Sequence, residues 1–156
     1  MWLQVLAAVL LAAFLFSMFR YAMALRASKT ARQSWRESEE ARGRRVLAEI
    51  PGADDAMTLF AEDDLGFYWG AERVTKREIA GARLRLNGGI LATWTRAGIA
   101  LPEPAVPEAF EGRERWDVVL YLDGGATRVV ECGTLREGVS REIATRIFEA
   151  VKTAGG

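Results

Sequence analysis

The stretch that decides the fold runs from Ile79 to Arg96 and reads IAGARLRLNGGILATWTR. In its first half, small and apolar residues alternate with Arg83 and Arg85, and this period of two is typical of a β-strand with two different faces. Asn87-Gly88-Gly89 follows, and such residues favour the backbone conformations of a tight hairpin turn. The chain then returns through a second apolar segment. The stretch therefore predicts an antiparallel β-hairpin.

Similar strand patterns occur on both sides of this hairpin. The further strands expected are residues 56–62, 67–69, 116–122 and 127–132, with a short seventh strand at 98–101. Asp63-Asp64-Leu65-Gly66 and Asp123-Gly124-Gly125 supply the turn residues that join them in pairs. The sequence thus predicts three hairpins and six to seven antiparallel strands.

The chain ends in an amphipathic helix. Val139, Ile143, Ile147 and Val151 recur at every fourth position, and Ser140 can cap the first turn. A helix with one apolar face needs an apolar surface to cover, and the hairpins offer one. We therefore expect an α+β fold in which a bent antiparallel sheet, or partly open barrel, is capped by one C-terminal helix.

This order of elements resembles a pleckstrin-homology-like (PH-like) domain. The resemblance is carried by Phe67-Tyr68-Trp69, by residues 79–89, by the hairpin of residues 118–132 and by the helix of residues 139–151. It implies a PH-like domain over residues 53–156, cytoplasmic if the anchor described below is correct. The phosphoinositide-binding members of that family have a basic pocket between the first two strands. Here the corresponding turn is the acidic Glu62-Asp63-Asp64, so lipid recognition is not implied.

The N-terminal segment has a different character. Residues 1–19 contain no charged side chain, and the first charge is Arg20. Eighteen helical residues span roughly 27 Å, close to the thickness of a bilayer core. We expect a transmembrane anchor at residues 1–25 that contacts lipid. The residues expected at its membrane interfaces are Trp2, Phe19, Arg20 and Tyr21.

Basic residues follow this segment, which places its C-terminal side in the cytoplasm under the positive-inside rule. The predicted localisation is therefore the bacterial inner membrane, with the N-terminus outside. A cleaved signal peptide ending near Ala24 and a buried core helix are the alternatives. Residues 26–52 predict a polar helical stalk that continues from the anchor, with a flexible tether as its alternative.

Composition restricts the chemistry. The chain has a single cysteine, Cys132, which excludes an internal disulfide. It has no histidine, the commonest general base and metal ligand. Residues 20–49 carry a net charge of +4 and residues 50–156 a net charge of −4. An acidic domain does not suit nucleic acid. We expect no catalytic residue, no cofactor and no metal, and Glu62-Asp63-Asp64 is interpreted as a solvated turn.

The expected function is that of a non-enzymatic, single-pass membrane protein, an accessory subunit, assembly factor or scaffold of an inner-membrane complex. A membrane-tethered sensor of an anionic lipid or small ligand is the alternative. The candidate docking residues are Arg83, Arg85 and Arg96, on the outer face of one hairpin, and Trp35 on the stalk. A solvated basic face is the other interpretation of the three arginines.

Overall fold

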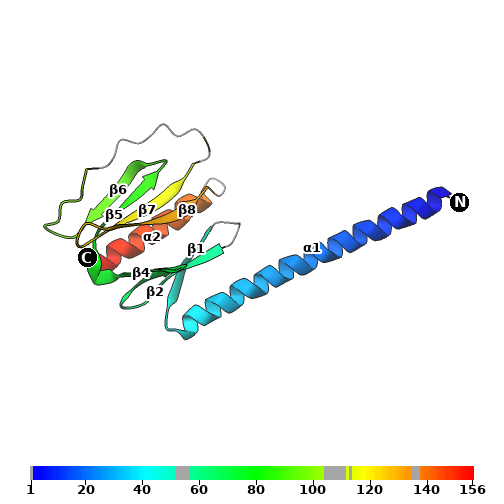
Figure 1. The fold of residues 1–156 in the computed structure, drawn as a ribbon, viewed down its shortest axis with the longest axis horizontal. Helices are drawn as coiled ribbons and strands as arrows, with labels where there is room; N and C mark the ends of the chain where they lie inside the picture. The colour runs from blue at the N-terminus through cyan, green and yellow to red at the C-terminus, as the bar shows by residue number, and fades with distance from the viewer. Residues whose placement is uncertain (1, 52–56, 104–111, 113, 135–137) are drawn as a thin grey trace. The chain divides into compact units, whose positions relative to one another are not determined.

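The structure is a computed structural model that describes residues 2–51, 57–103, 112, 114–134 and 138–156. The chain divides into two compact units, Met1–Ala41 and Arg42–Gly156. The first unit is α1 (Trp2–Ala41), a single helix of 40 residues (Figure 1). Gly43, with a φ of +76°, follows the end of α1, and glycine is the residue that most readily adopts such a conformation after a helix.

The predicted membrane anchor is contradicted by α1. Among the described residues, no helix is long and apolar enough to cross a membrane. The single-pass anchor at residues 1–25 and the inner-membrane localisation are corrected on this finding.

Within the described part of the second unit, eight strands form two antiparallel sheets of four. The first sheet has the order β1-β2-β3-β4: β1 (Arg45–Pro51), β2 (Met57–Glu62), β3 (Gly66–Trp69) and β4 (Glu72–Thr75). The second has the order β6-β5-β7-β8: β5 (Ile79–Leu86), β6 (Gly89–Thr95), β7 (Trp116–Leu122) and β8 (Thr127–Gly133). A short 3₁₀ helix, η2 (Lys76–Glu78), joins the sheets, and α2 (Val139–Gly155) follows the last strand.

The prediction of one bent sheet with six to seven strands is wrong. Strands are present at the six main positions expected, but β1 and β4 were not predicted, and residues 98–101 form no strand. The strand β1 lies inside the segment predicted as helical stalk. It pairs with β2, with Ala48 opposite Phe60. The chain is α+β with a helix at each end, and the resemblance to a PH-like domain stays a prediction.

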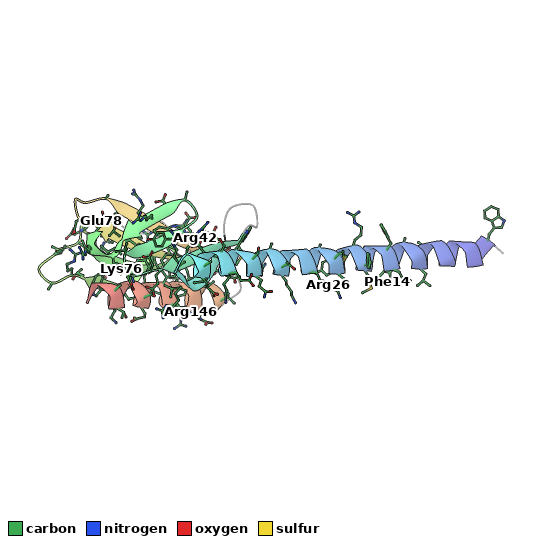
Figure 2. The ribbon with its side chains drawn as sticks, turned by 90° about the horizontal axis from the view of Figure 1, so that it is seen from below. Phe14, Arg26, Arg42, Lys76, Glu78 and Arg146 are labelled. Atoms are coloured by element: carbon green, nitrogen blue, oxygen red, sulfur yellow. The ribbon has the colours of Figure 1, made fainter. Side chains whose placement is uncertain are left out.

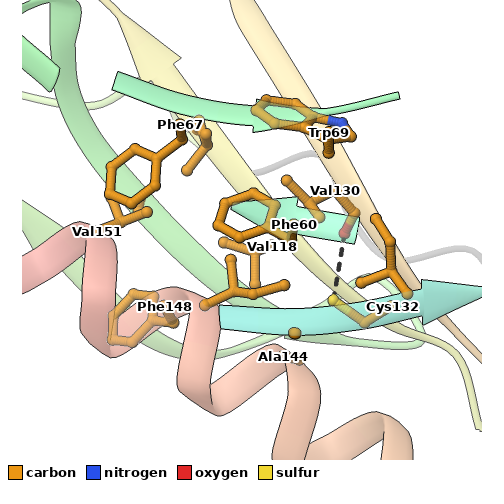
Figure 3. Close-up of a cluster of buried hydrophobic side chains, with 14 of the residues drawn as sticks. Phe60, Phe67, Trp69, Val118, Val130, Cys132, Ala144, Phe148 and Val151 are labelled. Carbon is orange, nitrogen blue, oxygen red and sulfur yellow. Dashed lines mark hydrogen bonds between the residues drawn. The ribbon is translucent and has the colours of Figure 1, made fainter. Parts of the chain in front are cut away.

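The hydrophobic core lies between the two sheets and α2. Figure 3 shows Phe60, Phe67 and Trp69 of the first sheet, Val118, Val130 and Cys132 of the second, and Ala144, Phe148 and Val151 of α2. The rings of Phe60 and Phe67 stack with their centroids 5.6 Å apart. In the central strands of the second sheet both faces are buried, over the first six residues of β5 and the first five of β7. The side of this sheet that faces α2 is apolar, and the opposite side carries the buried polar residues Arg83 and Asp117.

Candidate functional site

The first predicted docking residue, Arg83, is buried. Only 7% of its surface is exposed, on the face of the second sheet opposite α2. Its Nη1 donates to the hydroxyl of Tyr121 at 3.0 Å, and its Nη2 donates to the carbonyl oxygen of Pro102 at 2.7 Å. The segment after β6 therefore covers Arg83. The side chain binds within its own chain instead of standing on a solvated stripe.

Arg85 is the next residue on the same face and forms an ion pair with Asp117 of β7. Its Nη2 lies 3.3 Å from Oδ2 of Asp117, which is 1% exposed. Arg115 approaches the same oxygen, with its Nε at 3.5 Å. Asp117 Oδ1 and the Nε atoms of Arg83 and Arg85 are buried and lack a hydrogen-bond partner among the described residues. Asp117 thus joins β7 to Arg85 of β5 and to Arg115, which precedes β7.

Arg115 also closes the long connection between β6 and β7. The backbone N–H of Arg115 donates to Oδ1 of Asn87 at 2.7 Å. The backbone N–H of Asn87 donates to the carbonyl oxygen of Arg115 at 2.9 Å. Asn87 follows β5 and has a φ of +50°. These two hydrogen bonds hold the end of β5 beside the start of β7.

Arg96 binds the chain just before β5. It forms an ion pair with Asp123, with Nη1 3.2 Å from Oδ2. Its Nη2 donates to the carbonyl oxygens of Arg77 and Ile79 at 2.5 and 2.6 Å. The three predicted docking arginines thus all bind groups of their own domain.

The remaining predicted residues lie on α1 and are exposed. Trp35 is 50% exposed, Trp2 is 89%, Phe19 is 63% and Tyr21 is 69%. Arg20 is exposed as well. The side chains of α1 project outward from the helix, as Figure 2 shows for Phe14 and Arg26. The expected contact of residues 2–25 with lipid stays a prediction.

An apolar groove that the sequence did not reveal lies between the start of α2 and the second sheet. Its volume is about 580 Å³. Its large apolar lining residues, here called the floor, are Leu84, Leu86, Leu91, Ala92 and Trp116, and its other lining residues, here called the rim, are Glu114, Gly138, Arg141 and Thr145. Arg141 and Glu114 form no ion pair or hydrogen bond with the part of the chain that the structure describes. The groove has an apolar bottom and a charged rim.

A β-bulge in β6 lies at this groove. Ala92 lies opposite Leu84 and Ile90 opposite Arg85, so Leu91 is an extra residue in β6. Leu91 is 56% exposed and its neighbour Ile90 is 36% exposed. The sequence predicted the hairpin of β5 and β6 but not this bulge. The extra residue in β6 does not change the alternation of side chains in β5.

The groove adjoins the outer edge of the second sheet. No described strand pairs with β6 on the side away from β5, and Figure 1 shows β6 at that border. Edge strands expose backbone N–H and C=O groups that can pair with another chain. The seven residues of β6 provide about 23 Å of such edge.

The other three edges are less open. At β1, Arg146 donates to the carbonyl oxygen of Leu47, with Nη1 at 3.3 Å. The strand β4 has only four residues, and its Glu72 binds Arg128 of β8, with Oε2 3.1 Å from Nε. At its other end β8 meets Pro51 of β1 through Gly133. The groove therefore lies beside a seven-residue edge that no described strand covers.

Cys132 is the remaining reactive side chain of interest. It is fully buried, and its Sγ donates to the carbonyl oxygen of Val130 at 3.6 Å. Burial, with a smaller effect from the charge of Asp117, raises the pKa of Cys132 to about 12. A thiol that stays protonated and out of reach of solvent is a packing residue and not a nucleophile.

In the described ranges, no group of three histidine, cysteine, aspartate or glutamate side chains is placed to hold a metal ion. The Glu62-Asp63-Asp64 turn is occupied internally: Oδ1 of Asp63 accepts the N–H groups of Leu65 and Gly66, each at 2.8 Å. Comparisons of the chain with protein-family models, curated proteins and solved structures found no match. The groove beside β6 is therefore the candidate functional site.

Proposed function

We propose that residues 42–156 are a non-enzymatic protein-interaction domain of an accessory, assembly or scaffold protein. In this proposal the groove beside β6 binds an extended apolar segment of a partner protein. The observation that carries the proposal is the apolar groove of about 580 Å³ beside a sheet edge that no described strand covers. Extended segments bind protein surfaces in this way because the edge supplies hydrogen bonds and the groove accepts side chains.

The chemistry of the groove favours a protein segment. Its floor is formed by leucines, an alanine and Trp116, and aromatic residues are enriched at the centre of protein interfaces. The rim carries Arg141 and Glu114, one charge of each sign, so the rim alone does not select an anion. An apolar floor with a mixed polar rim is the usual anatomy of a docking site.

Two features support the absence of catalysis in this proposal. The protonated, buried thiol of Cys132 is unsuited to nucleophilic attack. The buried charges Arg83, Arg85 and Asp117 bind groups of their own domain. These contacts stabilise the domain, and in this proposal the groove binds the partner.

A small apolar ligand is the second candidate, because a volume of about 580 Å³ is within the range of ligand pockets. The groove is open along β6 and unlike the enclosed pockets that bury most of a ligand. We therefore prefer the protein segment. The experiment below separates the two, since a pocket for a compact ligand gives no peptide consensus.

The test selects binders from a phage-displayed library of random nine-residue peptides on the immobilised full-length chain. We expect a consensus with a large apolar residue. A synthetic peptide of that consensus should bind about tenfold more weakly to Leu91→Asp, because a charge in the groove removes about the free energy of one apolar contact.

The matched control is Leu65→Asp. Leu65 is 61% exposed in the turn before β3, while Leu91 is 56% exposed, so the two changes are alike in chemistry and exposure. The control should bind the peptide as the wild type does, and both variants should unfold at the same urea concentration as the wild type. The absence of a consensus, or equal weakening by both variants, would overturn the proposal.

A further inference from the structure

We infer that the partner segment binds as an added β-strand, hydrogen-bonded to the open edge of β6, with every second side chain in the groove. This inference rests on the proposed function and adds the binding mode and the sequence pattern of the partner. The pairing of the β6 backbone supports this inference. This strand pairs with β5 from Gly81↔Thr95 to Leu86↔Gly89, and no described strand occupies its other edge.

The second argument is the direction of the side chains along β6. Ala92 and Trp94 lie opposite Leu84 and Ala82, which belong to the core beneath α2. Thr93 lies opposite Arg83 and therefore faces the other side of the sheet. A strand added to β6 would continue this alternation, since neighbouring strands in a sheet present their side chains to the same two faces.

The third argument is the course of α2 over this part of the sheet. At its start, Arg141 and Thr145 line the groove together with Leu91 and Ala92. At its end, Gly155 lies so close to Trp94 that a Cβ on this glycine would overlap the indole ring. α2 thus packs over β5 and lies near β6 at Ala92 and at Trp94, so side chains of an added strand on this face would point toward α2.

The bulge at Leu91 limits the section of β6 that pairs regularly with β5. From Ala92 to Thr95 each residue of β6 lies opposite one residue of β5, so an added strand can pair there without interruption. Next to this section, the extra side chain of Leu91 offers an apolar contact on the groove side. The partner is therefore an extended segment with apolar residues at alternate positions, at least one of them large.

The test uses the synthetic consensus peptide and its analogues with a single N-methylated backbone amide at each position. N-methylation removes one donor and leaves the side chain unchanged. We expect weakening with a period of two: methylation at alternate positions weakens binding about three- to tenfold, which corresponds to one hydrogen bond each, and the positions between are tolerated.

A second measurement is hydrogen exchange of the full-length chain with and without the peptide. Amides of Gly89–Thr95 that point to the open edge should exchange at least about tenfold more slowly in the complex, while amides of Thr127–Gly133 should not change. A bound peptide that tolerates methylation at every position and leaves β6 exchange unchanged would overturn strand addition and leave groove docking standing. Failure to select any peptide would instead remove the proposed function and this inference together.

Discussion

Gly133, the last residue of β8, lies directly against Pro51, the last residue of β1. A Cβ placed on Gly133 would overlap Cγ of Pro51, and the φ of Gly133 is +80°. This contact joins the first sheet to the second where both strands end. Glycine is required there twice, once for its backbone conformation and once for the missing side chain.

Gly133→Ala should therefore destabilise the fold more than the backbone conformation alone explains. Gly124→Ala is the matched control, because Gly124 has a φ of +88° and a Cβ placed on it would meet no described atom within 4 Å. Both variants lose about 1 kcal/mol to strain, and overlap with Pro51 costs Gly133→Ala a further 1–3 kcal/mol, roughly. Urea unfolding of the full-length chain measures both, and equal losses would show that the sheets do not meet at this contact.

Tyr121→Phe should destabilise the domain by about 1–3 kcal/mol, because it removes an acceptor from a buried guanidinium. The hydroxyl accepts from Arg83 Nη1 at 3.0 Å, and only 7% of Arg83 is exposed. Tyr21→Phe removes the same hydroxyl from a side chain that is 69% exposed on α1 and should leave the unfolding midpoint unchanged. A Tyr121→Phe variant as stable as the wild type would mean that Arg83 finds another partner.

Asp117→Asn should be among the more damaging single substitutions in the chain. It removes the charge that Arg85 and Arg115 share, and breaking a buried ion pair from one side costs about 3 kcal/mol. The control is Asp64→Asn, since Asp64 is exposed in the turn before β3. Calorimetry of the two variants should show a lower Tm for Asp117→Asn only; a fall in both would indicate an effect of net charge.

Stability should fall with rising pH because of Cys132. Its pKa is about 12 in the folded chain against 9.0 for a free thiol, so the unfolded chain ionises first. The contribution of the neutral thiol is complete below pH 9 and is lost as the pH rises toward 12. Between pH 8 and pH 11 the loss is about 3 kcal/mol.

The Cys132→Ala variant isolates this effect, because other groups titrate in both proteins over the same range. The free energy of unfolding of the wild type should decrease more steeply with pH than that of the variant, although the variant starts lower because of its cavity. Parallel pH profiles would show that the thiol reaches solvent in the folded chain.

Local patterns predicted much of the second unit. The turn at Asn87-Gly88 and the alternation on both sides of it suffice for β5 and β6, and the fourfold repeat of apolar residues suffices for α2. These elements depend on neighbours in the sequence, which is the information that a pattern contains. The strand β1 was not predicted, because Arg42–Arg45 continues the polar composition of α1. Only its pairing with β2 shows that the segment is a strand.

The division into two sheets and the site could not be predicted in this way. Alternation shows that a segment has two faces, but it does not show which strand lies beside it. Arg83 and Arg85 alternate with apolar residues as solvated side chains do, and it is the distant Pro102 and Asp117 that bury them. The groove arises from the bulge at Leu91 and from the position of α2, which are both properties of the assembled domain.

The paired hydrogen bonds between Asn87 and Arg115 have a consequence for how this chain can change over time. They fasten together the two ends of residues 88–114, while β5 and β7 continue their ladder beneath. The alignment of β5 with β7 at this end therefore does not depend on the length of the chain between them. Insertions or deletions in that chain would leave the register of the two strands intact.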